Sequence, residues 1–321
     1  MRHIRRNERG QLTIGGHIAV DLAERFGTPL YVYSGDGLVA HYAAFASAVS
    51  ELDCVVHYAV KANSSLGVLG LLAQQGAGAD IVSGGEMKRA LSSGIAPDKI
   101  VFSGVGKTDD EIRAALQAGI GQINAESATE LVRISQIAAE TGKQAPVALR
   151  VNVNVDPGSH AKISTGQRST KFGIPVADGE AASLYRQMAS DAAIRPAGLA
   201  VHIGSQLTDL APFEKAYLEL LELADSLRDE GFEVPVLDLG GGLGIDYHGE
   251  QLPDFAAYGA LVTRIFSNRG YQLGFEPGRA IAADNGLLLT RTHYIKQGED
   301  KRFIIVDGAM NDLIRPTLYE A

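Results

Sequence analysis

Eight short apolar runs, separated by longer amphipathic stretches, constrain the fold of this chain more than any other feature of its sequence. The runs are Val55–Val60, Ala79–Val82, Ile100–Ser103, Gly121–Asn124, Ala148–Val153, Gly198–His202, Val236–Leu239 and Leu273–Glu276. Most are continuously apolar instead of alternating, which indicates strands buried on both faces, as in a parallel sheet. Eight such units over roughly 220 residues predict an α/β fold, a (β/α)8 barrel of the TIM type. The alternative is an open doubly wound sheet, which has fewer strands as a rule.

The stretches between the runs have the pattern of helices. They are Leu66–Gln75, Asp109–Ala118, Glu126–Glu140, Ala211–Glu230 and Phe255–Ser267. The acidic residues at 109–111 suit the first turn of a helix, and Ser127 with Glu130 has the spacing of a capping box. Strand and helix therefore alternate through the middle of the chain.

The two ends of the chain do not follow this alternation. Gln11–Ile14 resembles a strand and Ile18–Phe26 a helix, whereas Leu287–Ile295 and Phe303–Val306 have the pattern of an antiparallel hairpin. We therefore predict a barrel domain over residues 28–278 and a β-rich domain formed by residues 1–27 and 279–321. Two or three strands do not close a stable β-domain, so we expect this second domain to be incomplete at its C-terminal end.

Charge and cysteine content argue against several classes of partner. The net charge is -9, and no basic run gives the electrostatic footprint of a nucleic-acid-binding protein. Arg2, Arg5, Arg6 and Arg9 form a short exception, which we interpret as a solvated tip. The single cysteine, Cys54, permits no intrachain disulfide framework, and no apolar run reaches the roughly 18 residues that span a bilayer. We therefore expect a cytoplasmic protein with no nucleic-acid partner, no membrane partner and no metal site.

Barrel enzymes carry their chemistry at the C-terminal ends of the strands, and several of these ends hold unusual residues. Lys61 follows the first run, and His202 ends the sixth. Each has an ordinary structural interpretation, as a lysine whose stem packs while its amine reaches solvent and as a hydrogen-bonded histidine. The functional interpretation of Lys61 is an amine that binds a carbonyl group covalently. An acid and a base, Glu276 and Arg279, stand together after the eighth run.

Three consecutive glycines, Gly240, Gly241 and Gly242, follow the seventh run and can expose backbone N–H groups to a phosphate. The spacing differs from G-x-G-x-x-G, because position 245 is Ile, and the lysine of a P-loop is missing. Phosphate sites of barrels often lie after strands 7 and 8, and strand 1 is the neighbour of strand 8. Phosphate cradle, carboxylate, lysine and imidazole at one mouth indicate a site for pyridoxal 5′-phosphate (PLP). The alternative is a barrel that binds a different phosphorylated ligand.

Five motifs, in the same order, resemble those of a known family. They are Tyr58–Asn63, His202–Gln206, Asp238–Ile245, Glu276–Arg279 and Asp307–Tyr319. From about Gly10 to its end, the chain is similar to the PLP-dependent ornithine/diaminopimelate/arginine decarboxylase family, whose members have an alanine-racemase-like barrel. The last motif most resembles the members that act on diaminopimelate.

The resemblance implies a role for each matching residue. Two residues would be catalytic: Lys61, which would hold PLP, and His202, which would stack on the pyridine ring. Cofactor contacts would come from Lys61, Asp80, Arg150, His202, Ser205, Gly240, Gly241, Gly242, Glu276, Pro277, Gly278 and Arg279. Among them, Ser205 and the glycines would bind the phosphate, and Glu276 would pair with the pyridine nitrogen. The substrate would contact Arg279, Arg315 and Tyr319. We expect burial to lower the pKa of Lys61.

The function implied by the resemblance is the decarboxylation of meso-2,6-diaminopimelate to L-lysine and CO2, the last step of lysine biosynthesis. Family members are typically homodimers with shared active sites, which we expect here too. They also continue into a Cys-Glu motif and a late Tyr that this chain does not contain. Two alternatives therefore stay open: a decarboxylase of another basic amino acid such as ornithine, lysine or arginine, and a catalytically impaired PLP-binding homologue.

Overall fold

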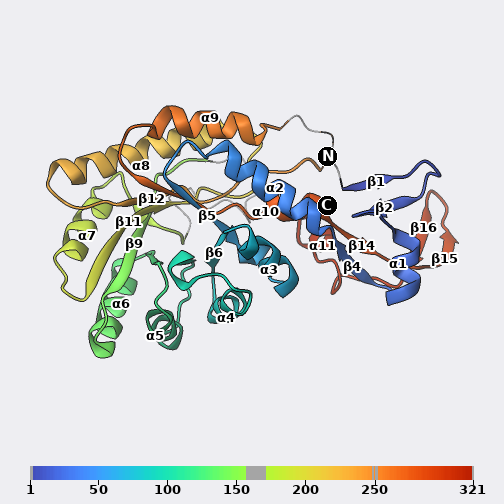
Figure 1. Cartoon of the computed structure of the whole chain (residues 1–321), viewed down its shortest axis with the longest axis horizontal. Helices are drawn as coiled ribbons and strands as arrows, with labels where there is room; N and C mark the ends of the chain where they lie inside the picture. The colour runs from blue at the N-terminus through green and yellow to red at the C-terminus, as the bar shows by residue number, and fades with distance from the viewer. Residues whose placement is uncertain (1–2, 157–170, 248, 250–251, 320–321) are drawn as a thin grey trace. The chain divides into compact units, whose positions relative to one another are not determined.

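The computed structural model describes residues 3–156, 171–247, 249 and 252–319, which form two compact units (Figure 1). The larger unit is His41–Ile281, and the smaller one combines Met1–Ala40 with Ala282–Ala321. The helix α2 (Gly35–Ala48) begins in the smaller unit and ends in the larger one.

The larger unit is built on a closed ring of eight parallel strands. They are β5 (Cys54–Ala59), β6 (Gly78–Ile81), β7 (Ile100–Phe102), β8 (Gln122–Ala125), β9 (Ala145–Asn152), β11 (Ile194–Val201), β12 (Val236–Asp238) and β13 (Gln272–Phe275). The ring closes where Leu273 of β13 lies opposite Cys54 of β5, and β8 pairs with β9 on the other side. A short extra strand, β10 (Ile174–Pro175), also pairs with β9. The predicted (β/α)8 barrel is therefore confirmed, and the open doubly wound sheet is excluded.

Helices follow the strands around the ring, with α3 to α6 along one side of the barrel and α8 and α9 along the opposite side (Figure 1). They are η1 (Val60–Ala62), α3 (Leu66–Gln74), α4 (Gly84–Ser92), η2 (Pro97–Lys99), α5 (Asp109–Ala118), α6 (Ala128–Thr141), α7 (Glu180–Ala189), α8 (Ala211–Asp229), α9 (Phe255–Phe266) and α10 (Arg279–Ala282). The turn η3 (Ala283–Asn285) follows α10 in the chain and belongs to the smaller unit. The five helices expected between the strands are all present, within two residues at each end. The sequence prediction did not include α2, α4, α7 and α10.

The helix start predicted at Ser127 is only half of a capping box. The Ser127 hydroxyl accepts the Glu130 N–H at 3.1 Å, as expected. The Glu130 carboxylate, however, does not return to the Ser127 backbone; it accepts the N–H of Glu126 at 2.8 Å. The complete capping box lies at the start of α5. There the Thr108 hydroxyl accepts the backbone N–H of Glu111, and the Glu111 carboxylate accepts the backbone N–H of Thr108 at 3.0 Å.

An aromatic cluster fastens α2, α8 and α9 to the outside of the barrel. Phe45 meets Phe275 edge-on at 5.8 Å between ring centroids, and Phe213 meets Tyr258 edge-on at 5.5 Å. The hydroxyls of Tyr217 and Tyr258 are hydrogen-bonded at 2.8 Å, which satisfies polar atoms that would otherwise be buried alone. The cluster gives the loops at this end of the barrel a rigid support.

The smaller unit contains three small sheets. They pair β1 (Ile4–Arg6), β2 (Leu12–Ile14) and β3 (His17–Ile18), then β4 (Leu30–Tyr33) with β14 (Gly286–Leu289), and β15 (Thr292–Gln297) with β16 (Arg302–Val306). The unit also contains the helices α1 (Ala19–Phe26) and α11 (Arg315–Tyr319). The predicted hairpin is present over β15 and β16, but its predicted first strand, Leu287–Ile295, is divided between β14, which pairs with β4, and β15.

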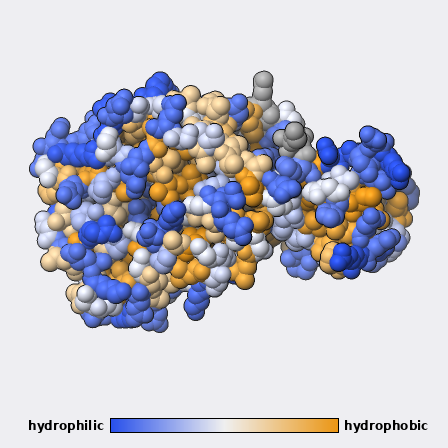
Figure 2. All heavy atoms as spheres, viewed as in Figure 1, coloured by the Kyte–Doolittle hydropathy of each residue, from blue (hydrophilic) through white to orange (hydrophobic). Residues whose placement is uncertain are grey.

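The hairpin β15–β16 exposes apolar side chains. Tyr294, Ile295 and Ile304 are each at least 60% exposed, and the space-filling view shows hydrophobic atoms on the visible face of this unit (Figure 2). Scattered exposed apolar residues are ordinary, whereas a contiguous group marks a surface that another segment or molecule covers. No helix in the described ranges is both long and apolar enough to cross a membrane.

Two glycine substitutions test the packing of the barrel helices. A Cβ added at Gly259 of α9 would lie 2.1 Å from the backbone oxygen of Ala48, so Gly259→Ala should lower the free energy of unfolding by about 1–3 kcal/mol. Gly70→Ala in α3 is the control, because its Cβ would meet no atom within 4 Å and alanine favours helix. Urea unfolding measures both. Equal effects in the same direction would contradict the packing described for α9.

Candidate active site

The side chain of Lys61 lies at the mouth of the barrel, in the turn η1 that follows β5. Its amine donates a hydrogen bond to Oδ2 of Asp80 on the neighbouring strand β6. The Lys61 side chain is 47% exposed, whereas Asp80 is 0% exposed. The amine is therefore held by a buried carboxylate and is still accessible from the mouth.

The pKa of Lys61 is raised, not lowered as we expected. Desolvation lowers it, but the charges of Asp80 and Glu276 together with the Asp80 hydrogen bond outweigh that effect. Burial alone therefore predicted the wrong direction for the pKa of Lys61, because the negative charge of Asp80 lies beside it on the adjacent strand. The second oxygen of Asp80, Oδ1, is buried and has no hydrogen-bond partner among the described residues.

The triple-glycine loop after β12 is packed against its neighbours at distances that only glycine allows. A Cβ at Gly240, where φ is +66°, would lie 2.4 Å from the backbone oxygen of Val201, and one at Gly241 would lie 2.2 Å from that of Glu276. The Gly240 carbonyl also accepts the N–H of Glu276 at 2.7 Å. Backbone from β11, β12 and β13 thus converges here, at distances that only a residue without a Cβ permits.

A small cavity adjoins this loop. It is lined by Phe45, Gly240, Gly241, Gly242, Leu243, Tyr258, Pro277, Gly278 and Ala280. Five of the predicted cofactor contacts, namely the three glycines with Pro277 and Gly278, therefore border one space.

His202 follows β11 and faces the same loop. Its Nδ1 accepts the N–H of Gly241 at 3.2 Å, which leaves the proton of a neutral ring on Nε2. Burial lowers the pKa of His202 well below its ordinary value, and the positive charges of Arg150 and Lys61 lower it further. The imidazole is thus neutral at physiological pH, as a ring that stacks on another heterocycle should be.

The carboxyl group of Glu276 lies at the end of β13 in the interior of the barrel. Burial raises its pKa well above the ordinary value, and the carboxylates of Asp238 and Asp80 raise it further, against the opposing charges of Lys61 and Arg150. The group therefore keeps a proton in the absence of a basic partner. The Ser103 hydroxyl lies 3.4 Å from its Oε1.

A buried polar network that the sequence prediction missed surrounds this carboxyl group. Gln122 donates to Oδ1 of Asn124 at 2.8 Å and to Oδ2 of Asp238 at 3.2 Å, and Asn124 donates to Ser103 at 3.0 Å. These residues interrupt otherwise apolar strands. A polar residue inside an apolar run is therefore the sequence signal that could have indicated this network. Together they tie the interior of the barrel to the loop of Gly240, whose N–H donates to Asp238 Oδ1 at 3.0 Å.

The other residues predicted for the site lie in several different elements of the chain. Arg150 is buried in β9, and Ser205 is half-buried in the loop after β11. Arg279 begins α10 and donates to the Tyr247 hydroxyl at 2.6 Å, while its buried Nε has no hydrogen-bond partner among the described residues. Arg315 and Tyr319 form the ends of α11 in the smaller unit, so their predicted substrate contacts stay predictions. The side chain of Tyr319 lies outside the described part of the chain.

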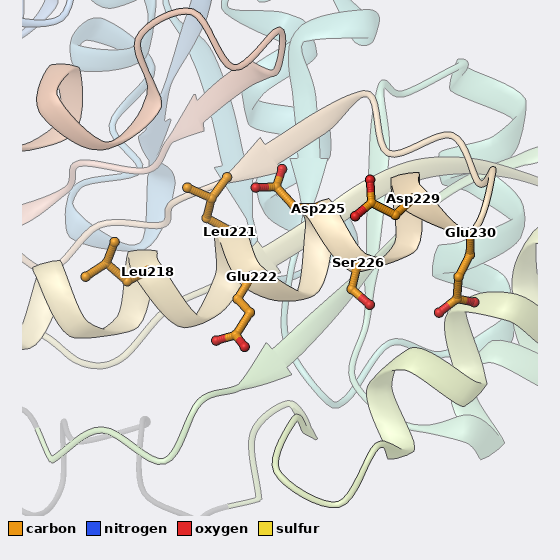
Figure 3. A pocket seen from close by; sticks show the side chains of 7 residues that line it. All are labelled: Leu218, Leu221, Glu222, Asp225, Ser226, Asp229 and Glu230. Carbon is orange, nitrogen blue, oxygen red and sulfur yellow. The ribbon is translucent and has the colours of Figure 1, made fainter.

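An open depression on the outer helix α8 has none of this chemistry (Figure 3). It is lined by Leu218, Leu221, Glu222, Asp225, Ser226, Asp229 and Glu230. Two of its acids are already partnered, Asp225 by the Tyr271 hydroxyl at 2.6 Å and Glu230 by Arg186 at 2.7 Å. With no cation in its lining, the depression suits neither a phosphate nor an amino-acid carboxylate.

The groups at the barrel mouth fit PLP. The accessible amine of Lys61 suits its aldehyde, the glycine loop suits its phosphate, and the buried carboxyl of Glu276 suits its ring nitrogen. The buried Oδ1 of Asp80, which has no hydrogen-bond partner among the described residues, can accept a further hydrogen bond at this position. No cluster of three or more histidine, cysteine, aspartate or glutamate residues suitable for a metal occurs in the ranges that the structure describes.

Comparison with known proteins agrees with this geometry. The family model "Pyridoxal-dependent decarboxylase, pyridoxal binding domain" matches residues 36–283. A diaminopimelate decarboxylase of Pseudomonas aeruginosa is 51% identical over 300 residues, which are 94% of this chain and 72% of the relative. The Helicobacter pylori diaminopimelate decarboxylase crystallised with L-lysine aligns with a TM-score of 0.91 at 39% identity, over 94% of this chain and 76% of that one. The M. jannaschii enzyme with L-lysine aligns with a TM-score of 0.93 at 37% identity, over 99% and 76% of the two chains.

The barrel and the groups at its mouth define the class as a PLP-binding (β/α)8 enzyme. This chain belongs to the family of pyridoxal-dependent decarboxylases. The resemblance inferred from the five sequence motifs is confirmed.

The raised pKa of Glu276 predicts that this residue destabilises the protein when no cofactor is bound. The folded state holds the proton more tightly than the unfolded chain, so stability falls as pH rises toward the raised pKa, by up to about 1.4 kcal/mol per pH unit. Glu276→Gln removes this loss. In urea unfolding without PLP, the variant should be the more stable protein, by a margin that grows as the pH rises above the ordinary pKa of a glutamate. A margin independent of pH would contradict the assigned protonation.

Proposed function

We propose that this chain decarboxylates meso-2,6-diaminopimelate to L-lysine and CO2 with PLP as cofactor, the last step of lysine biosynthesis. The observation that carries the proposal is the position of Lys61, whose accessible amine is paired with buried Asp80 at the mouth that also holds the glycine loop. The relatives named diaminopimelate decarboxylase supply the choice of reaction, because they are about half identical over nearly the whole chain.

PLP, when bound, supplies an electron sink for the pair of electrons left by the departing carboxylate. The chain's own residues prepare for this. Lys61 would hold the cofactor through its amine, and the hydrogen bond to Asp80 would orient that amine. Glu276, whose pKa burial raises, would place its carboxyl group against the ring nitrogen of the cofactor.

The other residues orient and shield the cofactor. Neutral His202 offers a flat, uncharged ring, because its charged form is opposed by burial and by Arg150. Ser205 and the glycines from 240 to 242 would bind the phosphate, and Pro277 and Gly278 line the same cavity as those glycines.

The arginines determine which amino acid is accepted. Diaminopimelate keeps a second amino-acid head when one carboxylate leaves, so its enzyme must hold a distal carboxylate. Arg279 and Arg315 suit this role, because a guanidinium binds a carboxylate through two parallel hydrogen bonds. Arg279 retains an unsatisfied Nε for such a partner, and Tyr319 is proposed as a further substrate contact. Ornithine has no distal carboxylate and needs no such group.

The proposed assembly is a homodimer with shared active sites, and the proposed location is the cytoplasm. The dimer is supported by the family resemblance and by the exposed apolar side chains of β15 and β16. The location is supported by the single cysteine, Cys54, which requires no oxidising compartment.

A substrate panel tests the function directly. The purified chain with added PLP should release lysine from meso-diaminopimelate and leave ornithine, lysine and arginine unchanged. Decarboxylation of one of those three instead would assign the alternative specificity. PLP binding without any turnover would favour the catalytically impaired homologue.

Arg315→Ala should raise the KM for diaminopimelate at least tenfold, since one charge-assisted pair to a carboxylate contributes about 1.5–3 kcal/mol. Its affinity for PLP should change less than twofold. The control is Arg302→Ala, which removes an exposed arginine of β16 in the same unit. Equal loss of substrate and PLP affinity in Arg315→Ala would instead make Arg315 a structural residue.

A further inference from the structure

Glu126, at the C-terminal end of β8, joins three neighbouring segments of the barrel. Its Oε1 accepts the N–H of Gly104 at 3.0 Å and the guanidinium Nη1 of Arg150 at 3.1 Å, and its Oε2 accepts the N–H of Gly173 at 3.3 Å. Glu126 is 5% exposed and Arg150 is 7% exposed. A carboxylate buried to this extent with three donors is costly to remove and fixes the groups that it binds.

A second buried ion pair holds Glu126 in place. The Lys107 amine, 1% exposed, donates to the carbonyls of Gly104 at 2.6 Å and Asn124 at 2.7 Å, and to Glu130 Oε1 at 3.0 Å. These three acceptors use all the donors of a lysine. The other oxygen of Glu130 accepts the backbone N–H of Glu126 at 2.8 Å. This contact explains why the capping box expected at Ser127 is incomplete.

Arg150 is the member of this network whose charge reaches two of the predicted cofactor contacts. Burial lowers the pKa of His202 and raises that of Glu276, and the positive charge of Arg150 lowers both. Its guanidinium also lies over the ring of Phe172, 4.9 Å from the centroid. Glu126 is the carboxylate that the structure shows hydrogen-bonded to this guanidinium.

We propose that Glu126 is a positioning residue for the PLP site, which orients Arg150 toward the cofactor and is itself locked by the Lys107–Glu130 pair. The inference rests on the proposed PLP-dependent function. Glu126 touches neither cofactor nor substrate in this account, and its effect passes through Arg150 alone. Lys107 and Glu130 are the outer part of the same network, because they fix the backbone of Glu126 and Gly104.

The test is a double-mutant cycle in PLP affinity, measured by titrating the cofactor-free full chain with PLP and following its absorbance. Glu126→Gln keeps the volume of the side chain and loses its charge, and it should bind PLP about tenfold more weakly. Arg150→Lys should also bind PLP more weakly. In the Arg150→Lys background, adding Glu126→Gln should have less than a twofold further effect. Additive losses would show that Glu126 does not act through Arg150.

Glu111→Gln is the matched control. Glu111 also bridges two loops, since its carboxylate accepts the N–H of Gly84 at 2.7 Å and of Thr108 at 3.0 Å, but it contacts no arginine of the site. This variant should have a lower melting temperature and an unchanged PLP affinity. If Glu111→Gln lost as much PLP affinity as Glu126→Gln, the effect of Glu126 would be a general structural one and not a positioning of Arg150.

A third variant keeps the proposal testable if Glu126→Gln does not fold. Lys107→Met removes the charge that compensates Glu130, so a folded fraction should also bind PLP more weakly than wild type. Unchanged affinity in that fraction would overturn the proposed locking of Glu126 by the Lys107–Glu130 pair. Wild-type protein that binds no PLP at all would instead contradict the proposed function, so the two failures are distinguishable.

Discussion

Closure of the parallel ring is the constraint on which the rest of the larger unit depends. Because β13 pairs with β5, the carboxyl group of Glu276 and the amine of Lys61 lie at the same mouth although they are more than two hundred positions apart in sequence. The pairing of β5 with β6 then places Asp80 beside Lys61. Closure also concentrates buried charge: against desolvation, the charges of Asp80 and Glu276 raise the pKa of Lys61, whereas burial raises the pKa of Glu276 and Lys61 opposes that rise.

The sequence predicted the barrel well, because apolar runs and turn residues are local signals. All eight strands lie where the runs are, but β9 and β11 begin three or four residues earlier than expected, as each contains a proline near its start and β11 has a register shift after Pro196. The helix α4 was missed because it begins with Gly84 and Gly85, which disfavour helix, and is fixed by the Ser83 cap. The pairing of β14 with β4 joins distant parts of the chain, and no local pattern indicates it.

The candidate site was predictable where a residue type is unusual for its position. Lys61, His202 and the three glycines stand out at strand ends, and the structure brings them together around one mouth. The pKa of Lys61 was not predictable, because it depends on Asp80 across a strand pair. The contact of Gln122 with Asp238 was likewise not predictable, since it joins side chains of β8 and β12, whereas Gln122 and Asn124 are two positions apart on one strand.

The most direct measurement is to reduce the complex of the purified chain and PLP with borohydride and to locate the added mass by peptide mapping. The account predicts a single modified lysine, Lys61, and no modification in Lys61→Ala. Lys107 should stay unlabelled, because its amine is buried and its three donors are satisfied. Modification of another lysine, or none in a chain that binds PLP, would contradict the assignment of the barrel mouth as the cofactor site.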